Sequence, residues 1–277
     1  MKILKLLLFT IILGVFSHSG FFLDNGIGIK GMQVGGAYTA NPEGGEALYW
    51  NVANLISIKE SEFYFSYAQK YEDLTDYSFI YSIPSGEGSA IGVAYYKSGV
   101  DNIIQRDTAT SNTSTFQFID DAIFLGYAQK LPFGHSYGVS LKLISQKAVD
   151  EASYMSLDLG YKFILGMFDF GLVAQDVFVS EESTEIKPRY RAGLSTQVLG
   201  FTLSTDYMHS MLLEKGFLMY GVIYDGLPIV SIKAGYNEYD KNLYAGLSVN
   251  LFSLKLDYLY SNPDLGVVHQ FGMGVNF

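Results

Sequence analysis

Cysteine is absent from this 277-residue sequence, charged residues make up only 17%, and no long apolar run follows residue 16. Without cysteine the chain has neither disulfides nor thiolate metal ligands, and no lipid-modified N-terminal cysteine. A soluble domain usually contains about 25% charged residues, so the low fraction indicates a large apolar surface. Acidic residues outnumber basic ones, 28 to 18, which argues against nucleic-acid binding.

The N-terminus has the pattern of a secretory signal peptide. Lys2 and Lys5 precede the apolar run Leu6–Phe16, and a small, polar stretch ends at Gly20. The run is too short for a membrane-spanning helix, which needs about 20 apolar residues. We therefore predict that residues 1–20 direct Sec-type export and are removed. An exported chain without a spanning helix is either a soluble secreted β protein or an outer-membrane β-barrel.

Residues 59–277 read as a series of short alternating strands. In residues 156–163, for example, Leu157, Leu159, Tyr161 and Phe163 share one face, and Ser, Asp, Gly and Lys occupy the other. A soluble β-sandwich also alternates in this way. Here, however, the polar face is unusually small, and the apolar face ends repeatedly in Tyr or Phe, as the aromatic girdles of a membrane barrel do. Tyrosine and phenylalanine number 22 and 20.

The connections between the runs alternate between short turns and longer loops. Fourteen runs fit this alternation, with both chain ends on the short-turn side. The longest predicted loops are Ser98–Gln117 and Asp176–Pro188. The predicted short turns are Pro84–Gly88, Pro132–His135, Leu165–Met167, Leu199–Gly200, Asp225–Pro228 and Leu251–Phe252. The predicted fold class is all-β, a transmembrane antiparallel β-barrel of fourteen strands, and twelve or sixteen strands remain open.

Residues 21–58 fit neither a strand nor a helix. Their centre, Gly31–Leu55, is rich in Gly and Ala, is interrupted by Pro42 and contains the only tryptophan, Trp50. No period of 2 or 3.6 residues is sustained there. We predict that these residues form an N-terminal hatch inside the barrel lumen.

Several short motifs resemble the PorV/PorQ group within the wider FadL-like (OMPP1/FadL/TodX) outer-membrane barrels. The matching pieces are Gly35–Ala40, Ala47–Asn51, Pro188–Arg189 with Arg191–Gly193, and a C-terminal block of Asp257–Tyr260, Leu265–Gly266 and His269–Phe271 that ends in Phe277. The resemblance implies a fourteen-strand barrel with a lumenal hatch. It also implies that Phe277, the terminal aromatic residue, is read by the barrel-assembly machinery.

One position departs from the pattern of that family. The family usually has Asn-Pro-Ala after the tryptophan, whereas this chain has Asn51–Val52–Ala53. Valine does not fix φ and it retains a backbone N–H, so a fixed kink is not expected from this sequence. The chain is also short for a long-chain fatty-acid transporter.

Eight charged residues fall on the lumen face of the predicted strands. They could form a polar passage or a docking surface for the hatch, or they could simply pair with one another, as buried charges normally do. They are Lys142, Asp158, Lys162, Arg191, Asp206, Lys233, Lys255 and Asp257.

The hatch contributes Gly35, Gly36, Trp50 and Asn51 as candidate site residues. The two glycines and Asn51 would belong to a movable gate, or the glycines would only permit tight backbone turns. For Trp50, a packing role is favoured over ligand contact.

No enzymatic or metal site is predicted. Three histidines follow the leader, His135, His209 and His269, and none has metal-ligand spacing. Nucleophile-elbow and phosphate-loop motifs are absent. A Ser–His pair assembled across strands is the one catalytic arrangement left open. We predict no catalytic residues, no metal and no cofactor.

Two functions follow from this interpretation. The first is a passive outer-membrane channel for small hydrophobic solutes, gated or plugged by the hatch. The alternative is a PorV/PorQ-type accessory that docks secretion-system proteins and transports nothing itself. The expected location is the outer membrane. The expected partners are outer-membrane lipids, the barrel-assembly machinery and either hydrophobic small molecules or secretion-system proteins, but not nucleic acid.

Overall fold

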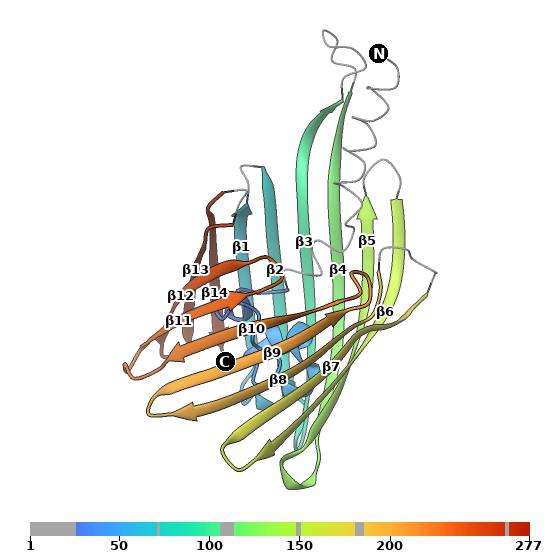
Figure 1. Ribbon diagram of the computed structural model, residues 1–277. Helices are drawn as coiled ribbons and strands as arrows, with labels where there is room; N and C mark the ends of the chain where they lie inside the picture. Colours follow the sequence, from blue (N-terminus) through green and yellow to red (C-terminus); the bar gives the residue numbers. More distant parts are fainter. Residues whose placement is uncertain (1–25, 71–72, 106–113, 148–150, 181–185, 264–265) are drawn as a thin grey trace.

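A computed structural model describes residues 26–70, 73–105, 114–147, 151–180, 186–263 and 266–277. Over these residues the chain forms a closed barrel of fourteen antiparallel strands, with β1 paired to β14 (Figure 1). The strands are β1 (Glu62–Lys70), β2 (Leu74–Pro84), β3 (Ser89–Gln105), β4 (Ser114–Lys130), β5 (Ser136–Lys147), β6 (Glu151–Leu165), β7 (Phe168–Val179), β8 (Arg189–Val198), β9 (Phe201–Ser210), β10 (Lys215–Tyr224), β11 (Val230–Asn237), β12 (Asn242–Leu251), β13 (Leu254–Ser261) and β14 (Val268–Asn276). The predicted fourteen-strand barrel is confirmed, and the β-sandwich is excluded.

The two faces of the barrel wall follow from the alternation in sequence. Successive side chains of a strand point to opposite faces of a sheet. In β14, Phe271 and Met273 are exposed on the outer face, whereas Val268 and Gln270 are buried on the lumen face. The last residue completes the closure, because Phe277 and Ser61 exchange backbone hydrogen bonds of 2.9 and 3.1 Å. No strand edge is left unpaired where the barrel closes.

The six predicted short turns all lie at one end of the barrel, and the remaining connections, including the two longest, lie at the other end. The prediction that Ser98–Gln117 is a loop is wrong, because β3 and β4 continue through most of it as a long hairpin (Figure 1). Residues 106–113 of that loop lie outside the described residues. The predicted start of the next long loop at Asp176 is also wrong, because β7 continues to Val179.

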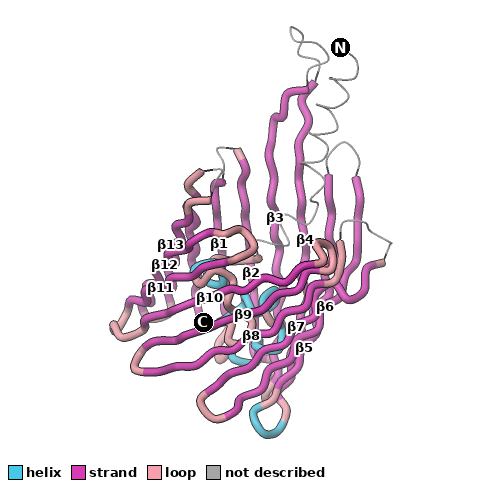
Figure 2. The backbone as a smooth tube through the Cα atoms, in the orientation of Figure 1, coloured by secondary structure: helices cyan, strands magenta, loops and turns pink. Residues whose placement is uncertain are grey.

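Residues 26–58, hereafter the N-terminal segment, lie within the lumen as a chain of short helical turns (Figure 2). These turns are α3 (Lys30–Gln33), η1 (Gly44–Glu46), α4 (Ala47–Trp50) and η2 (Val52–Ser57). None of the described helices is long and apolar enough to cross a membrane. The predicted signal peptide, residues 1–20, and residues 21–25 of the predicted hatch lie outside the described residues.

Candidate functional site

The N-terminal segment is folded around one buried carboxylate. Glu46 accepts hydrogen bonds from the backbone nitrogens of Ile29, Lys30 and Gly31 at 3.1, 3.2 and 3.3 Å. The first helical N–H groups have no partner within a helix, and Ile29 supplies no side-chain cap to α3. Glu46 therefore satisfies these donors from a position 15 to 17 residues further along the chain. No motif in the sequence marks Glu46 as a site residue.

A belt of glycines on the lumen face of the wall lets the barrel close tightly around this segment. A Cβ added at any of these glycines would crowd the segment. At Gly138 it would lie 2.7 Å from the carbonyl carbon of Val52, and at Gly193 it would lie 2.8 Å from the backbone nitrogen of Ala40. We call this set the glycine belt: Gly92, Gly126, Gly138, Gly160, Gly171, Gly193, Gly221, Gly235 and Gly246.

The glycine belt extends across strands β3 to β8 and β10 to β12. Several of its members are direct cross-strand partners, including Gly138 with Gly160 and Gly221 with Gly235. Opposed glycines leave space for a neighbouring backbone that any larger residue would fill. The wall therefore lies close to the backbone of the segment at β5 to β8, β10 and β11, and close to side chains of the segment at β3, β4 and β12.

Polar side chains hold the segment in register with the wall. Asp206 accepts hydrogen bonds from the backbone nitrogens of Tyr38 and Thr39 at 3.1 and 2.8 Å. Lys233 donates to the side-chain oxygen of Gln33 over 2.9 Å. The same Gln33 side chain donates to two backbone carbonyls of the wall, at 3.2 and 3.0 Å.

Trp50 is the packing centre of the segment. Its ring makes edge-to-face contacts with the rings of Tyr38 and Tyr49, at centroid distances of 6.0 and 5.1 Å. The guanidinium group of Arg191 lies 4.8 Å from the centroid of the Trp50 ring, a geometry suited to cation–π attraction.

Buried Asn51 ends α4 and donates to the carbonyl of Thr39 over 2.9 Å. Its side chain also accepts from the nitrogen of Ala53 over 3.2 Å, so the bend between α4 and η2 forms without the family proline.

The two hatch glycines adopt backbone conformations that other residues rarely reach. Gly35 and Gly36 have φ values of 64° and 82°. Gly35 also lies against the backbone of Tyr236, where an added Cβ would be 2.7 Å from the nitrogen. Both the left-handed backbone and the close approach require glycine here. Gly36 lies beside Arg191 and Trp50.

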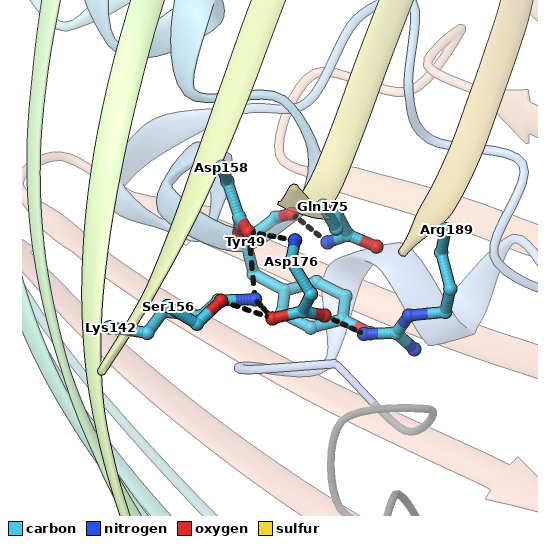
Figure 3. Close-up of polar contacts among 7 residues, drawn as sticks. All are labelled: Tyr49, Lys142, Ser156, Asp158, Gln175, Asp176 and Arg189. Atoms are coloured by element: carbon cyan, nitrogen blue, oxygen red, sulfur yellow. Dashed lines mark hydrogen bonds and ion pairs between the residues drawn. The ribbon is translucent and has the colours of Figure 1, made fainter. Parts of the chain in front are cut away.

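A buried charge cluster occupies the lumen side of β5 to β8 (Figure 3). The ammonium of Lys142 pairs with Asp158 at 2.8 Å and also with Asp176. Ser156 donates to Asp176 over 2.5 Å, and Arg189 lies 3.4 Å from the same carboxylate. One ammonium and one guanidinium thus face two carboxylates, so the charges balance within the cluster.

The cluster stabilises an irregular part of β7. Between the pairs Leu157–Phe178 and Leu159–Ala174, β6 has one residue and β7 has three. The extra residues form a bulge, in which Asp176 has a φ of 56° and its backbone nitrogen donates to Asp158 over 2.8 Å. Within the bulge, Gln175 donates to the carbonyl of Tyr49 in the N-terminal segment over 2.9 Å.

Sequence reasoning missed Gln175, Asp176 and Arg189. The signal was present, because two adjacent polar residues interrupt an otherwise apolar run in β7. In a regular strand one of them would face lipid. The bulge turns both inward, and both are buried.

The remaining predicted lumen charges also have partners on the described chain. Lys162 donates to Asn41 of the N-terminal segment over 2.9 Å, and Lys255 donates to Glu62 over 2.7 Å. Asp257 accepts from Tyr64 over 3.0 Å and also from Ser248. Most of the eight charges therefore contact the segment or another charged group, rather than lining an open polar path.

No cluster of three or more His, Asp or Glu side chains suited to a metal occurs among the described residues.

The barrel is similar to solved hydrocarbon channels. It superposes on the CymD monoaromatic hydrocarbon channel with a TM-score of 0.69 and 13% identity, covering 91% of this chain and 98% of that chain. The P. putida toluene transporter TodX gives 0.66 and 10% identity, with 91% and 99% covered. A Pseudomonas aeruginosa FadL homologue gives 0.62 and 10%, with 89% and 97% covered.

These likenesses show a fold of the FadL-like type, at identities too low to show more. No family model matches the sequence. No curated protein matches it either. The narrower resemblance to PorV/PorQ proteins therefore rests on the short sequence motifs alone.

Proposed function

We propose that this protein is an outer-membrane channel for small, mainly hydrophobic solutes, in which the N-terminal segment closes the lumen. The observation that carries the proposal is an apolar cluster on the lumen wall, contributed mainly by β3 to β7, that lies against the segment. Tyr96, Phe124 and Ile144 are buried in one apolar cluster with Tyr49 and Trp50 of the segment. Buried ion pairs such as Lys70–Asp76 and Lys142–Asp158 also line the lumen, but their charges are paired with one another.

This apolar wall continues toward the long-loop end of the barrel. Tyr154 and Val179 pack against the cluster from β6 and β7, and buried Ile186 joins it just before β8. A solute that enters from this end can contact these aliphatic and aromatic groups before it reaches Tyr49. Contacts of this kind are weak and multiple, so a hydrophobic solute can bind and still leave. That the known neighbours include channels for monoaromatic hydrocarbons supports the same solute class.

The glycine belt implies that conduction needs movement of the N-terminal segment. A solute cannot pass between two backbones in van der Waals contact unless one of them shifts. The segment is secured by hydrogen bonds and by Trp50 packing, and neither is covalent. We therefore propose a closed resting state that opens by local displacement of the segment.

The test is uptake of a hydrophobic probe by cells whose outer leaflet is lipopolysaccharide, which retards such probes. Cells that produce the protein should take up N-phenylnaphthylamine faster than control cells, whereas entry of the polar β-lactamase substrate nitrocefin should be unchanged. Equal probe uptake with and without the protein would refute the channel. If a secretion-system subunit also co-purified, the accessory role implied by the PorV/PorQ resemblance would be favoured instead.

A further inference from the structure

The bulge of β7 contacts the N-terminal segment through one residue and the buried charge cluster through the next. Gln175 donates to the carbonyl of Tyr49 in α4 over 2.9 Å. The carboxylate of Asp176 accepts from Arg189 of β8 and pairs with Lys142 of β5 (Figure 3). Because Gln175 and Asp176 are consecutive, the placement of the Gln175 amide depends on how Asp176 is held.

The backbone of the bulge has a conformation that needs support from its surroundings. Asp176 has a left-handed φ of 56°, and a residue other than glycine keeps such a φ only where its neighbours hold it there. Its backbone nitrogen donates to Asp158, and the cations Lys142 and Arg189 balance the two carboxylates. Without Arg189, the two buried carboxylates would share one cation. That imbalance favours movement of Asp176 toward water.

The connection between β7 and β8, residues 180–188, enters the lumen at its C-terminal end. Ile186 is 3% exposed and belongs to the same apolar cluster as Tyr49 and Trp50. Among the described residues of the connections at the long-loop end, Ile186 alone is buried. Three residues later, Arg189 begins β8. The connection therefore reaches the segment twice, through Ile186 and, by way of Arg189 and the bulge, through Gln175.

We propose that the β7–β8 connection controls docking of the N-terminal segment from the long-loop end of the barrel. Outward movement of residues 186–189 withdraws the Arg189 guanidinium from Asp176. The bulge then no longer holds Gln175 against the carbonyl of Tyr49, and α4 is released on this side. Arg189 is a positioning residue, because it acts on the segment through the bulge. The effect on docking does not require transport, whereas its consequence for solute uptake rests on the proposed function.

Tryptic cleavage after Lys30 measures undocking in the refolded barrel, because Lys30 is 4% exposed in the docked segment. Arg189→Met should raise the cleavage rate at least about fivefold, as expected when a buried acceptor loses its donor. Arg189→Lys keeps a cation beside Asp176 and should recover most of the protection. Lys187→Met removes a positive charge from the same connection and is the control, with cleavage at the wild-type rate. A wild-type rate in Arg189→Met would overturn the proposal.

A double variant tests whether Arg189 acts through the bulge. Once Gln175→Met has removed the bond to Tyr49, adding Arg189→Met should change the cleavage rate by less than about twofold. Effects that multiply would show that the two residues act on the segment independently, and the proposed control would be wrong.

Heat-modifiable migration shows whether each variant forms a folded barrel. If Arg189→Met does not fold, Ile186→Ser takes its place, since it removes the buried apolar contact of the connection and leaves the charge cluster intact. Ile186→Ser should also speed cleavage after Lys30. Cleavage of Ile186→Ser at the wild-type rate would contradict the proposal.

Uptake of N-phenylnaphthylamine by cells separates this inference from the proposed function. Cells that produce Arg189→Met should take up the probe faster than cells that produce the parent. Faster cleavage with unchanged uptake would confirm the control of docking and refute the channel. Faster uptake with unchanged cleavage would refute the control of docking and leave the channel intact.

Discussion

The side chain of Gln175 donates a hydrogen bond to the backbone carbonyl of Tyr49 over 2.9 Å. This bond joins the bulged part of β7 to the helix that carries Trp50. It connects residues 126 positions apart in the chain, and both groups are buried. The irregular strand and the segment that fills the lumen therefore stabilise each other.

Replacing Gln175 with Met should weaken the docking of the N-terminal segment. The carbonyl of Tyr49 would remain buried without this donor, at a cost of about 1–3 kcal/mol. Fluorescence of Trp50, the only tryptophan, reports docking during urea unfolding in detergent micelles. Gln197→Met, the same change at an exposed position of β8, is the control. An unchanged midpoint for Gln175→Met would show that this bond does not hold the segment.

Lys142→Met should destabilise the whole barrel rather than only the segment. Lys142 is fully buried between Asp158 and Asp176, and its removal leaves two carboxylates with only Arg189 nearby. Loss of one partner from a buried ion pair typically costs about 3–5 kcal/mol. Heat-modifiable migration in gels measures folded barrel, and Lys147→Met on the exposed end of β5 is the control. Wild-type heat stability in Lys142→Met would mean that the cluster contributes little to folding.

Gly138→Ala tests the glycine belt. The added Cβ would lie 2.7 Å from the carbonyl carbon of Val52, and neither backbone can swing aside as a side chain can. We expect a loss of about 1–3 kcal/mol in docking, as for overpacked cores, and faster tryptic release of the segment. Gly216→Ala is the control, because its Cβ would meet only the far end of the exposed Tyr207 side chain. Equal rates of release for the two variants would contradict the tight fit.

The barrel could be predicted from the sequence because its signals are local. Strand alternation, turn residues and loop parity depend on neighbouring residues, and together they placed all six short turns. The prediction of a loop at Ser98–Gln117 was wrong because it relied on the same local alternation. Beyond the membrane, a hairpin needs no apolar face, so β3 and β4 continue where the alternation fades.

The interior of the site could not be predicted in the same way. The phase of each strand placed Lys142, Asp158 and Asp206 on the lumen face, but their partners come from distant parts of the chain. The contact of Asp206 with Thr39, for instance, spans 167 residues. The bulge in β7 adds two residues, so the alternation resumes unchanged at Phe178 and only Asp176 departs from it; no local rule assigns Asp176 to the lumen. The glycine belt is visible as single glycines in many strands, but its function appears only when the segment is in place.

Docking of the segment should weaken as pH rises, because of Glu46. Burial raises the pKa of Glu46 to about 7, and nearby Asp257 adds to this while the Lys30 ammonium opposes it. The pKa of Glu46 in the folded protein exceeds its ordinary value of 4.5. The stabilisation that Glu46 gives to the docked segment is therefore complete below pH 4.5 and is lost as pH rises through about 7.

Protease protection of the segment, followed from about pH 5 to about pH 8, measures this dependence. Glu46→Gln keeps an acceptor oxygen for the nitrogens of Ile29 and Lys30 but cannot ionise, so its protection should be flat over the same range. If the wild-type protein also shows flat protection, then Glu46 does not control docking. If Glu46→Gln retains the wild-type slope, another group is responsible.

A reversible cross-link can decide whether the segment moves during transport. The Cβ of Val34 lies 2.8 Å from the Cβ that a side chain at Gly221 would have. A disulfide needs a Cβ separation of about 3.5–4.5 Å, so Val34→Cys with Gly221→Cys should cross-link after a shift of about 1 Å. The oxidised double variant should lose uptake of N-phenylnaphthylamine, and reduction should restore it in the same cells. Wild-type protein carries no cysteine and should not respond to the oxidant. Full uptake by the oxidised form would mean that the segment is a static plug and that solutes take a route past it.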